Sequence, residues 1–216
     1  MATGTRKRSS SKKQKSPLYS LLELVATVAV AVGLAFLIQA FIVKPYRIPS
    51  GSMEPTLNIG QRILVNRLST HPGIGDIVVF HPPAGATDFG EGNGVCGNRS
   101  QGSGHSQACD QPTNKKSSQT FVKRVVGLPG DHLRILNGHV IRNGAAEKDS
   151  YILPCQAGDE VCNFPKTIVV PAGDYYMMGD NRGFSDDSRF WGPVPHKWII
   201  GEAFFTYWPP DRIGTL

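Results

Sequence analysis

The sequence has little of what most often builds metal centres and hydrolase triads. It contains four cysteines in 216 residues, and no two of them have C-x-x-C spacing. That spacing is typical of structural zinc sites, so zinc is disfavoured. None of the six histidines has a setting typical of a catalytic base, and the G-x-S-x-G elbow is absent. The sequence therefore predicts no metal and no cofactor, and it does not favour a Ser-His-Asp triad.

Acidic residues are missing from the first 16 positions, which hold six lysines and arginines. The rest of the chain has 17 basic and 17 acidic residues, so the net charge of +6 belongs to this segment alone. A basic domain that binds nucleic acid is therefore not predicted. Ser/Lys-rich composition is typical of disorder, and residues 1–17 are predicted to form a disordered basic tail.

Charge is also missing from the apolar run that follows. Only a threonine, a glycine and a glutamine interrupt residues 24–43, and such a length matches the ~30 Å bilayer core. A cleavable signal peptide has a shorter apolar region, of about 7–15 residues, and a buried core helix is a further alternative. We predict a retained transmembrane helix over residues 18–43. The positive-inside rule then places the tail in the cytoplasm and residues 44–216 outside, in a single-pass plasma-membrane protein.

The four cysteines all follow this run, on the predicted outer side, where disulfides persist. Three pairings are possible. The sequential pairing closes two short loops and is favoured: Cys96 with Cys109, and Cys155 with Cys162.

Long amphipathic helices are absent after the apolar run, and short runs rich in β-branched or aromatic residues alternate with turn signals. The class is therefore mostly β, an antiparallel sandwich or barrel-like sheet. Asn137-Gly138 is a strong signal for a two-residue hairpin. Residues 84–119 contain seven glycines and few large apolar residues, so they are predicted to be an insertion without its own core. The strands are expected at 62–67, 76–80, 121–126, 132–136, 139–142, 167–170, 174–178 and 201–207.

Residues 48–57 place Ser50 and Ser52 on either side of Gly51, between two prolines. Proline excludes a long helix or a central strand here, and glycine lets the backbone approach a ligand. A serine displayed in this way can be a nucleophile if a base takes its proton. A plain Ser/Gly/Pro turn is the alternative.

Lys123 is the candidate base. In an extended strand it shares a face with Phe121 and Val125, whereas Arg124 points the other way. Apolar surroundings disfavour the charged form of a lysine, and a neutral amine can accept a serine proton. The alternative is a lysine at a strand edge that reaches water.

A third polar segment, residues 179–192, lies between two β-rich stretches. Asp187 and Arg189 are two residues apart, so on an extended strand they would share a face and could pair. The alternative is a solvated loop with a surface ion pair of little energetic value.

Four segments together resemble the bacterial type I signal peptidases, membrane-anchored Ser/Lys enzymes that remove signal peptides. They read I-P-S-G-S-M-x-P-T-L (48–57), G-D-I-V-V-F (75–80), K-R-V-V-G-L-P-G-D (123–131) and G-D-N-R…S-x-D-S-R-x-W-G (179–192). Their order makes the resemblance specific. It implies an antiparallel β catalytic domain with a smaller cap at about 131–178. It also implies cleavage of the signal peptides of exported preproteins after Ala-x-Ala sites, with the bilayer as a further partner.

The resemblance assigns roles by position. Ser52 would be the nucleophile and Lys123 the general base, while the Ser50 hydroxyl and the Ser52 N–H would bind the oxyanion. Ser185 would orient the amine. Ion pairs of Arg124, Asp187 and Arg189 would support the site, and the apolar substrate pockets would be lined by Tyr46, Ile48, Met53, Leu57 and Val122.

The sequence also allows other functions. Another Ser/Lys peptidase could act on soluble proteins, although the apolar anchor argues against it. A sortase-like transpeptidase needs a free thiol, whereas the cysteines here are predicted to be paired. An anchored β-domain without activity would have no need of Ser52, Lys123 and Ser185 together.

Overall fold

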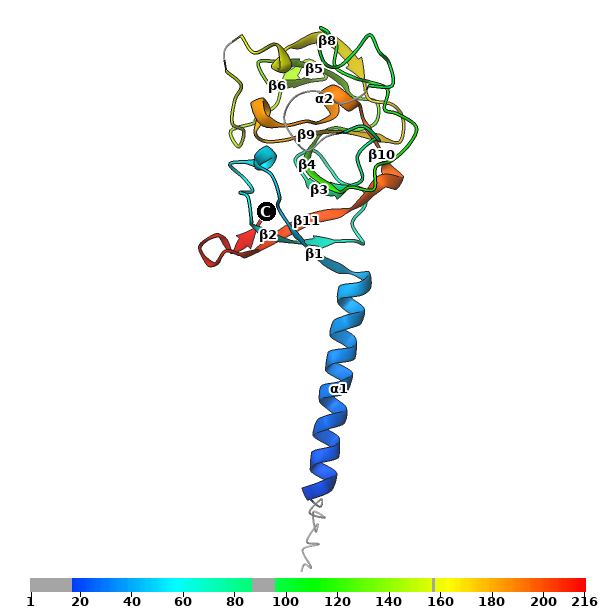
Figure 1. The fold of residues 1–216 in the computed structure, drawn as a ribbon, viewed down its shortest axis with the longest axis vertical. Helices are drawn as coiled ribbons and strands as arrows, with labels where there is room; N and C mark the ends of the chain where they lie inside the picture. The colour runs from blue at the N-terminus through cyan, green and yellow to red at the C-terminus, as the bar shows by residue number, and fades with distance from the viewer. Residues whose placement is uncertain (1–16, 87–95, 157) are drawn as a thin grey trace, which may run out of the picture. The chain divides into compact units, whose positions relative to one another are not determined.

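The computed structural model describes residues 17–86, 96–156 and 158–216 (Figure 1). Of the predicted tail, only Pro17 is among the described residues, and part of the predicted insertion also lies outside them. The chain forms two units, Met1–Ala40 and Phe41–Leu216.

The described residues of the first unit form the helix α1 (Pro17–Phe41), whose last residue belongs to the second unit. Proline suits the first helical turn because its missing N–H would have no partner there. The 25 residues of α1 rise by about 38 Å, which exceeds the ~30 Å bilayer core. By length and composition, Pro17–Gln39 could cross a membrane. Val43, the last residue of the predicted span, instead begins the first strand.

The second unit is mostly β, as predicted. All eight predicted strands are present with small shifts at their ends, and four short strands were not predicted: β1, β7, β10 and β12. The strands are β1 (Val43–Arg47), β2 (Arg62–Asn66), β3 (Ile77–Phe80), β4 (Phe121–Gly127), β5 (His132–Leu136), β6 (His139–Arg142), β7 (Ala145–Ala146), β8 (Phe164–Val169), β9 (Asp174–Met178), β10 (Val194–Pro195), β11 (Ile199–Trp208) and β12 (Gly214–Thr215).

The strands form two antiparallel sheets. The larger has the order β1-β2-β11-β3-β4-β9-β10, with β12 added to β11, and the smaller has the order β7-β6-β5-β8. Figure 1 shows β5, β6 and β8 at one end of the domain and β1, β2 and β11 at the other. The smaller sheet is inserted between β4 and β9, so those two neighbouring strands are separated in sequence by about one quarter of the domain.

The larger sheet curls because its longest strand is irregular. The register of β11 shifts between Ala203 and Phe205 and again between Thr206 and Trp208 where it pairs with β2. Such bulges bend a strand and increase its twist. The curled sheet encloses an apolar cluster that includes Ile48, Met53 and Leu57 from the segment after β1. The core therefore fixes the segment that carries the candidate nucleophile.

The hairpin predicted at Asn137-Gly138 joins β5 to β6. Both residues have positive φ, 51° and 81°, as a type I′ turn requires. Local sequence was enough here because few residue pairs tolerate two positive φ angles.

The described part of the predicted insertion packs on the domain. It carries the disulfide Cys96–Cys109, and the Cys109 N–H donates to the Arg189 carbonyl at 2.9 Å. Ala108 and Cys109 are buried. This segment therefore covers the third polar segment, although it lies about 80 residues away in the chain.

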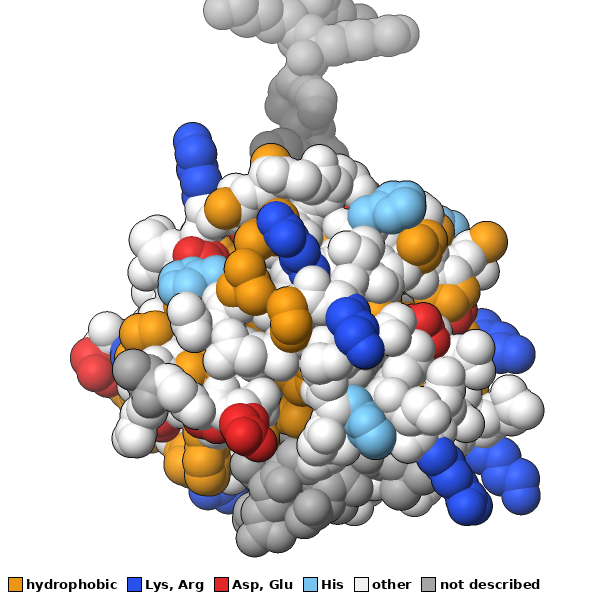
Figure 2. All heavy atoms as spheres, turned by 90° about the horizontal axis from the view of Figure 1, so that it is seen from above, with side chains coloured by type: hydrophobic (Ala, Val, Ile, Leu, Met, Phe, Trp, Pro, Cys, Tyr) orange, Lys and Arg blue, Asp and Glu red, His pale blue; other side chains and the backbone are white. Residues whose placement is uncertain are grey.

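Figure 2 shows the end of the domain nearest the smaller sheet. Apolar, basic and acidic side chains are interspersed on this face rather than gathered in one patch. Such a mixture is usual for a surface in contact with water.

Candidate active site

Ser52 lies in a short 3-10 helix, η1 (Gly51–Met53), directly after the extended Ser50. The Ser50 hydroxyl donates to Ser52 Oγ at 3.4 Å. Asn181 holds the turn from outside: its N–H donates to the Ser52 carbonyl and its side-chain amide to the Gly51 carbonyl, both at 3.1 Å. Ser52 is buried, so its position is set by the surrounding structure.

Lys123 lies in the middle of β4, and its side chain points into the domain. Phe121, Lys123 and Val125 are all buried, which confirms the predicted alternation of this strand. The Lys123 Nζ donates to Ser185 Oγ at 3.0 Å and lies 5.8 Å from the Phe121 ring centroid. The alternative of a lysine reaching water at a strand edge is wrong, because only 2% of Lys123 is exposed.

Gly179 brings the two serines to the same place. A Cβ atom at this position would collide with both Ser185 Oγ and the Ser52 carbonyl. Only glycine therefore allows η1 and the segment after β9 to approach so closely. The structure thus gathers Ser52, Lys123 and Ser185 in one site, from three separate parts of the chain.

Asp187 and Arg189 form an ion pair, but not on a strand as the spacing suggested. Asp187 caps the short helix α2 (Ser188–Trp191) and accepts the Arg189 N–H. Its two oxygens also accept from Arg189 Nε at 2.8 Å and Nη2 at 2.9 Å. Both side chains are fully buried, so the alternative of a surface pair is wrong. The capping turn bends the chain and brings the side chains of Asp187 and Arg189 together. The extended strand predicted from their spacing does not have this bend.

This pair supports the site through the backbone. Asp187 accepts the Gly179 N–H at 3.1 Å, and Arg189 Nη2 donates to the Ser185 carbonyl at 3.1 Å. Burial opposes ionisation of Asp187, but Arg189, Lys123 and the Gly179 N–H outweigh it and lower its pKa. The carboxylate thus remains ionised and fixes the residues on either side of it.

Arg124 points to the opposite face of β4 and pairs with Asp180. Its Nε and Nη2 donate to the two Asp180 oxygens at 2.8 and 2.7 Å, and its Nη1 donates to the Gly75 carbonyl at 2.6 Å. Burial opposes the charge, but Asp180 outweighs it and raises the pKa of Arg124. Thr56 donates to Asp180 at 2.5 Å. Sequence reasoning quoted Asp180 in its motif but missed this role, because 56 residues separate it from Arg124.

A second buried arginine, Arg182, was also missed. Its Nε donates to the Gly179 carbonyl at 3.1 Å, and its Nη1 donates to the Gly138 carbonyl in the hairpin turn. Burial and the nearby Arg189 lower the pKa of Arg182. The disulfide Cys155–Cys162 has the favoured pairing and lies in the same region, with Cys162 Sγ 3.8 Å from Arg189 Nη1.

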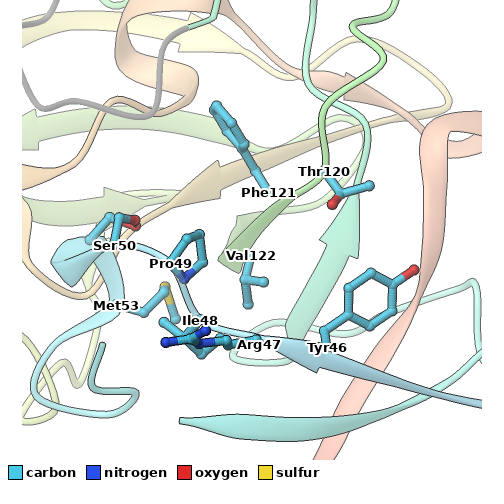
Figure 3. A pocket seen from close by; sticks show the side chains of 10 residues that line it. Tyr46, Arg47, Ile48, Pro49, Ser50, Met53, Thr120, Phe121 and Val122 are labelled. Atoms are coloured by element: carbon cyan, nitrogen blue, oxygen red, sulfur yellow. The ribbon is translucent and has the colours of Figure 1, made fainter. Parts of the chain in front are cut away.

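A pocket of about 90 Å³ opens beside the two serines (Figure 3). Four of the five predicted lining residues border it: Tyr46, Ile48, Met53 and Val122. The fifth, Leu57, does not line it but is buried in the apolar cluster that also contains the lining residues Ile48 and Met53. Residues that sequence reasoning missed complete the wall: Arg47, Pro49, Thr120 and Phe121.

The described residues, 17–86, 96–156 and 158–216, include no group of three or more His, Cys, Asp or Glu side chains placed to hold a metal. The chemistry that these side chains can perform is proton transfer and nucleophilic attack at a carbonyl.

Comparison with known proteins places this arrangement in a family. The family model described as signal peptidase, peptidase S26, matches residues 21–208. A probable signal peptidase I-1 from Synechocystis sp. is 38% identical over 205 residues, which cover 93% of this chain and 89% of the relative. The signal peptidase I of Leptolyngbya laminosa is 36% identical over 207 residues, 94% of this chain and 86% of the relative.

A solved signal peptidase I from Enterococcus faecalis aligns with a TM-score of 0.38 at 24% identity, over 61% of this chain and 95% of that one. A score this low carries no conclusion about the fold. The family model, by contrast, matches most of the chain. This protein therefore belongs to the signal peptidase family, peptidase S26.

Proposed function

We propose that this chain removes signal peptides from exported preproteins, with Ser52 as nucleophile and Lys123 as general base. The observation that carries the proposal is the buried hydrogen bond from Lys123 Nζ to Ser185 Oγ, 3.0 Å long, in the site that also holds Ser52. Membership of the signal peptidase family and the names of its relatives supply the substrate class.

In the first half of the reaction, neutral Lys123 accepts the Ser52 proton as Ser52 Oγ bonds to the scissile carbonyl carbon. The Ser50 hydroxyl, 3.4 Å from Ser52 Oγ, then turns to the oxyanion together with the Ser52 N–H. The C–N bond breaks, and Lys123 returns the proton to the leaving amine.

In the second half, Lys123 takes a proton from water, and the resulting hydroxide attacks the Ser52 ester. The acyl–oxygen bond breaks and Ser52 recovers its proton from Lys123. Ser185 orients the amine throughout, and it needs no change of charge to do so.

The size and lining of the pocket support a preference for small side chains. Its volume is about 90 Å³. Ile48, Met53 and Val122 line it with apolar surface. An alanine methyl group suits such an apolar pocket, so cleavage after Ala-x-Ala sites is proposed.

The apolar helix supports the proposed location. Residues 1–17 would be the cytoplasmic tail, α1 would cross the plasma membrane, and residues 44–216 would form the extracytoplasmic peptidase domain. Within it, residues 131–178 would be a cap and residues 84–119 the insertion. The two disulfides suit an oxidising compartment.

Two experiments test this proposal. The purified full chain in detergent should cut a preprotein after its Ala-x-Ala site, as measured by the mass of the released mature protein, and S52A should give no product. Replacing the final alanine by tryptophan should block the cut. Cleavage by S52A, or a wild-type cut elsewhere, would refute the mechanism or the specificity. For location, protease added outside spheroplasts should digest the domain and spare the tail.

A further inference from the structure

A second cavity, of about 290 Å³, is lined by basic side chains. Arg67, His81, Lys116 and Lys197 line it together with Phe41 and Trp198, and none of its lining residues is acidic. It has no residue in common with the pocket beside Ser52. The proposed peptidase reaction therefore gives this cavity no role.

The backbone brings these four basic residues together from four separate segments. Arg67 directly follows β2, and Lys197 lies in the turn before β11. His81 follows β3, and its N–H donates to the Trp198 carbonyl at 2.9 Å. Lys116 comes from the predicted insertion and is held by a β-bridge to Pro83. Since fixed backbone contacts gather the side chains, the charges of Arg67, Lys116 and Lys197 add at one place although each lies on a different segment.

The cavity lies next to the point where the chain leaves the apolar helix. Phe41 belongs to the folded domain and is also the last residue of α1. The Arg67 N–H donates to the Ile42 carbonyl at 2.8 Å. Three apolar side chains therefore lie near the cations, and all three are exposed: Phe41 (68%), Ile42 (38%) and Leu68 (71%). Exposed apolar side chains beside cations at the end of a span are typical of a membrane interface.

We propose that this cavity binds the phosphate of an anionic phospholipid in the leaflet where α1 ends. Arg67 and Lys116 would contact the phosphate, and Phe41, Ile42 and Leu68 would lie against the acyl chains. Lys197, whose charge also acts on Asp174, would add a third positive charge. The proposal rests on α1 crossing the membrane and not on the chemistry of Ser52 and Lys123.

A lipid fits these observations better than a soluble anion does. A soluble anion would use the cations but would leave the three apolar side chains in water, where each raises the free energy of the surface. A diacyl phospholipid uses both. Each basic side chain near an anionic lipid surface contributes about 1 kcal/mol, equivalent to about fivefold in affinity.

The test compares two charge-matched triple variants of the full chain in detergent. In R67Q/K116Q/K197Q the cavity loses its cations. In R134Q/K148Q/K166Q three exposed cations elsewhere in the domain are lost. Native mass spectrometry would measure binding of dioleoyl phosphatidylglycerol, dioleoyl phosphatidylcholine and inorganic phosphate. Thermal unfolding of each variant would show that it is folded.

Wild type and the control variant should bind phosphatidylglycerol in preference to phosphatidylcholine, and the cavity variant should lose about 100-fold in affinity. Equal binding by the two variants would overturn the proposal. Displacement of the lipid by millimolar inorganic phosphate would identify a soluble-anion site instead, and displacement by an acidic peptide would identify a peptide site. Cleavage of a soluble signal-sequence peptide in lipid-free detergent should be equal in all three proteins, so this test stands apart from the proposed function.

Discussion

Lys123 and Arg124 are neighbours on β4, yet their side chains lie on opposite faces of this strand and have different hydrogen-bond partners. On one face, Lys123 donates to the neutral hydroxyl of Ser185. On the other face, Arg124 donates to both oxygens of Asp180 and to the Gly75 carbonyl. The alternation of strand side chains separates two environments that are one residue apart.

The difference lies in the group that each basic side chain contacts. A carboxylate stabilises the charged form of its partner, and Asp180 raises the pKa of Arg124 accordingly. A hydroxyl can accept a hydrogen bond from an ammonium group or donate one to a neutral amine, so it orients a lysine in either state. The Lys123 face therefore suits proton transfer and the Arg124 face suits stability.

The largest expected effect is on activity at the Lys123 face. K123M should abolish preprotein cleavage, and K123R should abolish it too, because arginine remains protonated and cannot act as a base. K148M removes an exposed lysine and serves as the control. The double variant S52A/K123M should be no worse than either single variant, since the two groups act as a unit. Single-turnover cleavage measures these variants and S52A, and near-normal turnover by K123M would refute the assignment.

At the Arg124 face the main effect should be on stability. R124M leaves the fully buried Asp180 carboxylate without its cation, which typically destabilises a protein by about 3–5 kcal/mol. The midpoint of urea unfolding of the isolated domain or of the detergent-solubilised chain measures this loss. K123M breaks no bidentate ion pair, although Lys123 does act on the Asp187 carboxylate. It should therefore lose less stability than R124M. If K123M proved the more destabilised variant, the two faces would not differ as we describe.

A smaller effect separates the two serines near the reacting groups. S50A removes one oxyanion donor and should lower kcat by roughly 10²–10³-fold without moving the midpoint of the pH profile. S185A removes the hydroxyl that contacts the amine, so it should lower activity and move that midpoint. S50T keeps the hydroxyl and is the control. Activity should rise with pH in every active variant, because the neutral amine is the base. A midpoint that moves in S50A and not in S185A would reverse the two roles.

The smallest expected effect concerns Glu147, whose pKa is raised more by burial than it is lowered by nearby arginines. Burial raises the pKa of Glu147 to about 7, although Arg182 and Arg142 act in the opposite direction. Because the pKa of Glu147 is higher in the folded state, its contribution to the free energy of unfolding is complete below 4.5, its pKa in the unfolded chain. It is lost as the pH rises through about 7. After allowance for solvent screening, we expect the wild type to lose roughly 1–2 kcal/mol of stability between pH 5 and pH 8.

E147Q removes this titration and should be the more stable protein at pH 8, with a flatter dependence of stability on pH. Urea unfolding at several pH values measures the difference between the two proteins. The same pH dependence in both would show that Glu147 is not the responsible group.

Local sequence determined most of the secondary structure of this protein. The apolar run forms one long helix, and eight strands lie where β-branched and aromatic residues alternate between turn signals. The Asn137-Gly138 turn and both disulfide pairings also agree with the sequence. These features depend on residues close together in the chain, for which composition and spacing are sufficient information. The four short strands were missed because two to five residues carry too little pattern.

Tertiary structure alone decided which distant groups meet. Ser185 reaches Lys123 across 62 residues, and Asp180 reaches Arg124 across 56. Both contacts exist because β9, which precedes the third polar segment, pairs with β4, although the whole smaller sheet separates them in sequence. The prediction that Asp187 and Arg189 lie on an extended strand was wrong for a related reason, because a buried helix cap bends the chain there. Spacing records how far apart residues lie along the chain, whereas long-range strand pairing, chosen by burial of the whole core, decides which of them share a site.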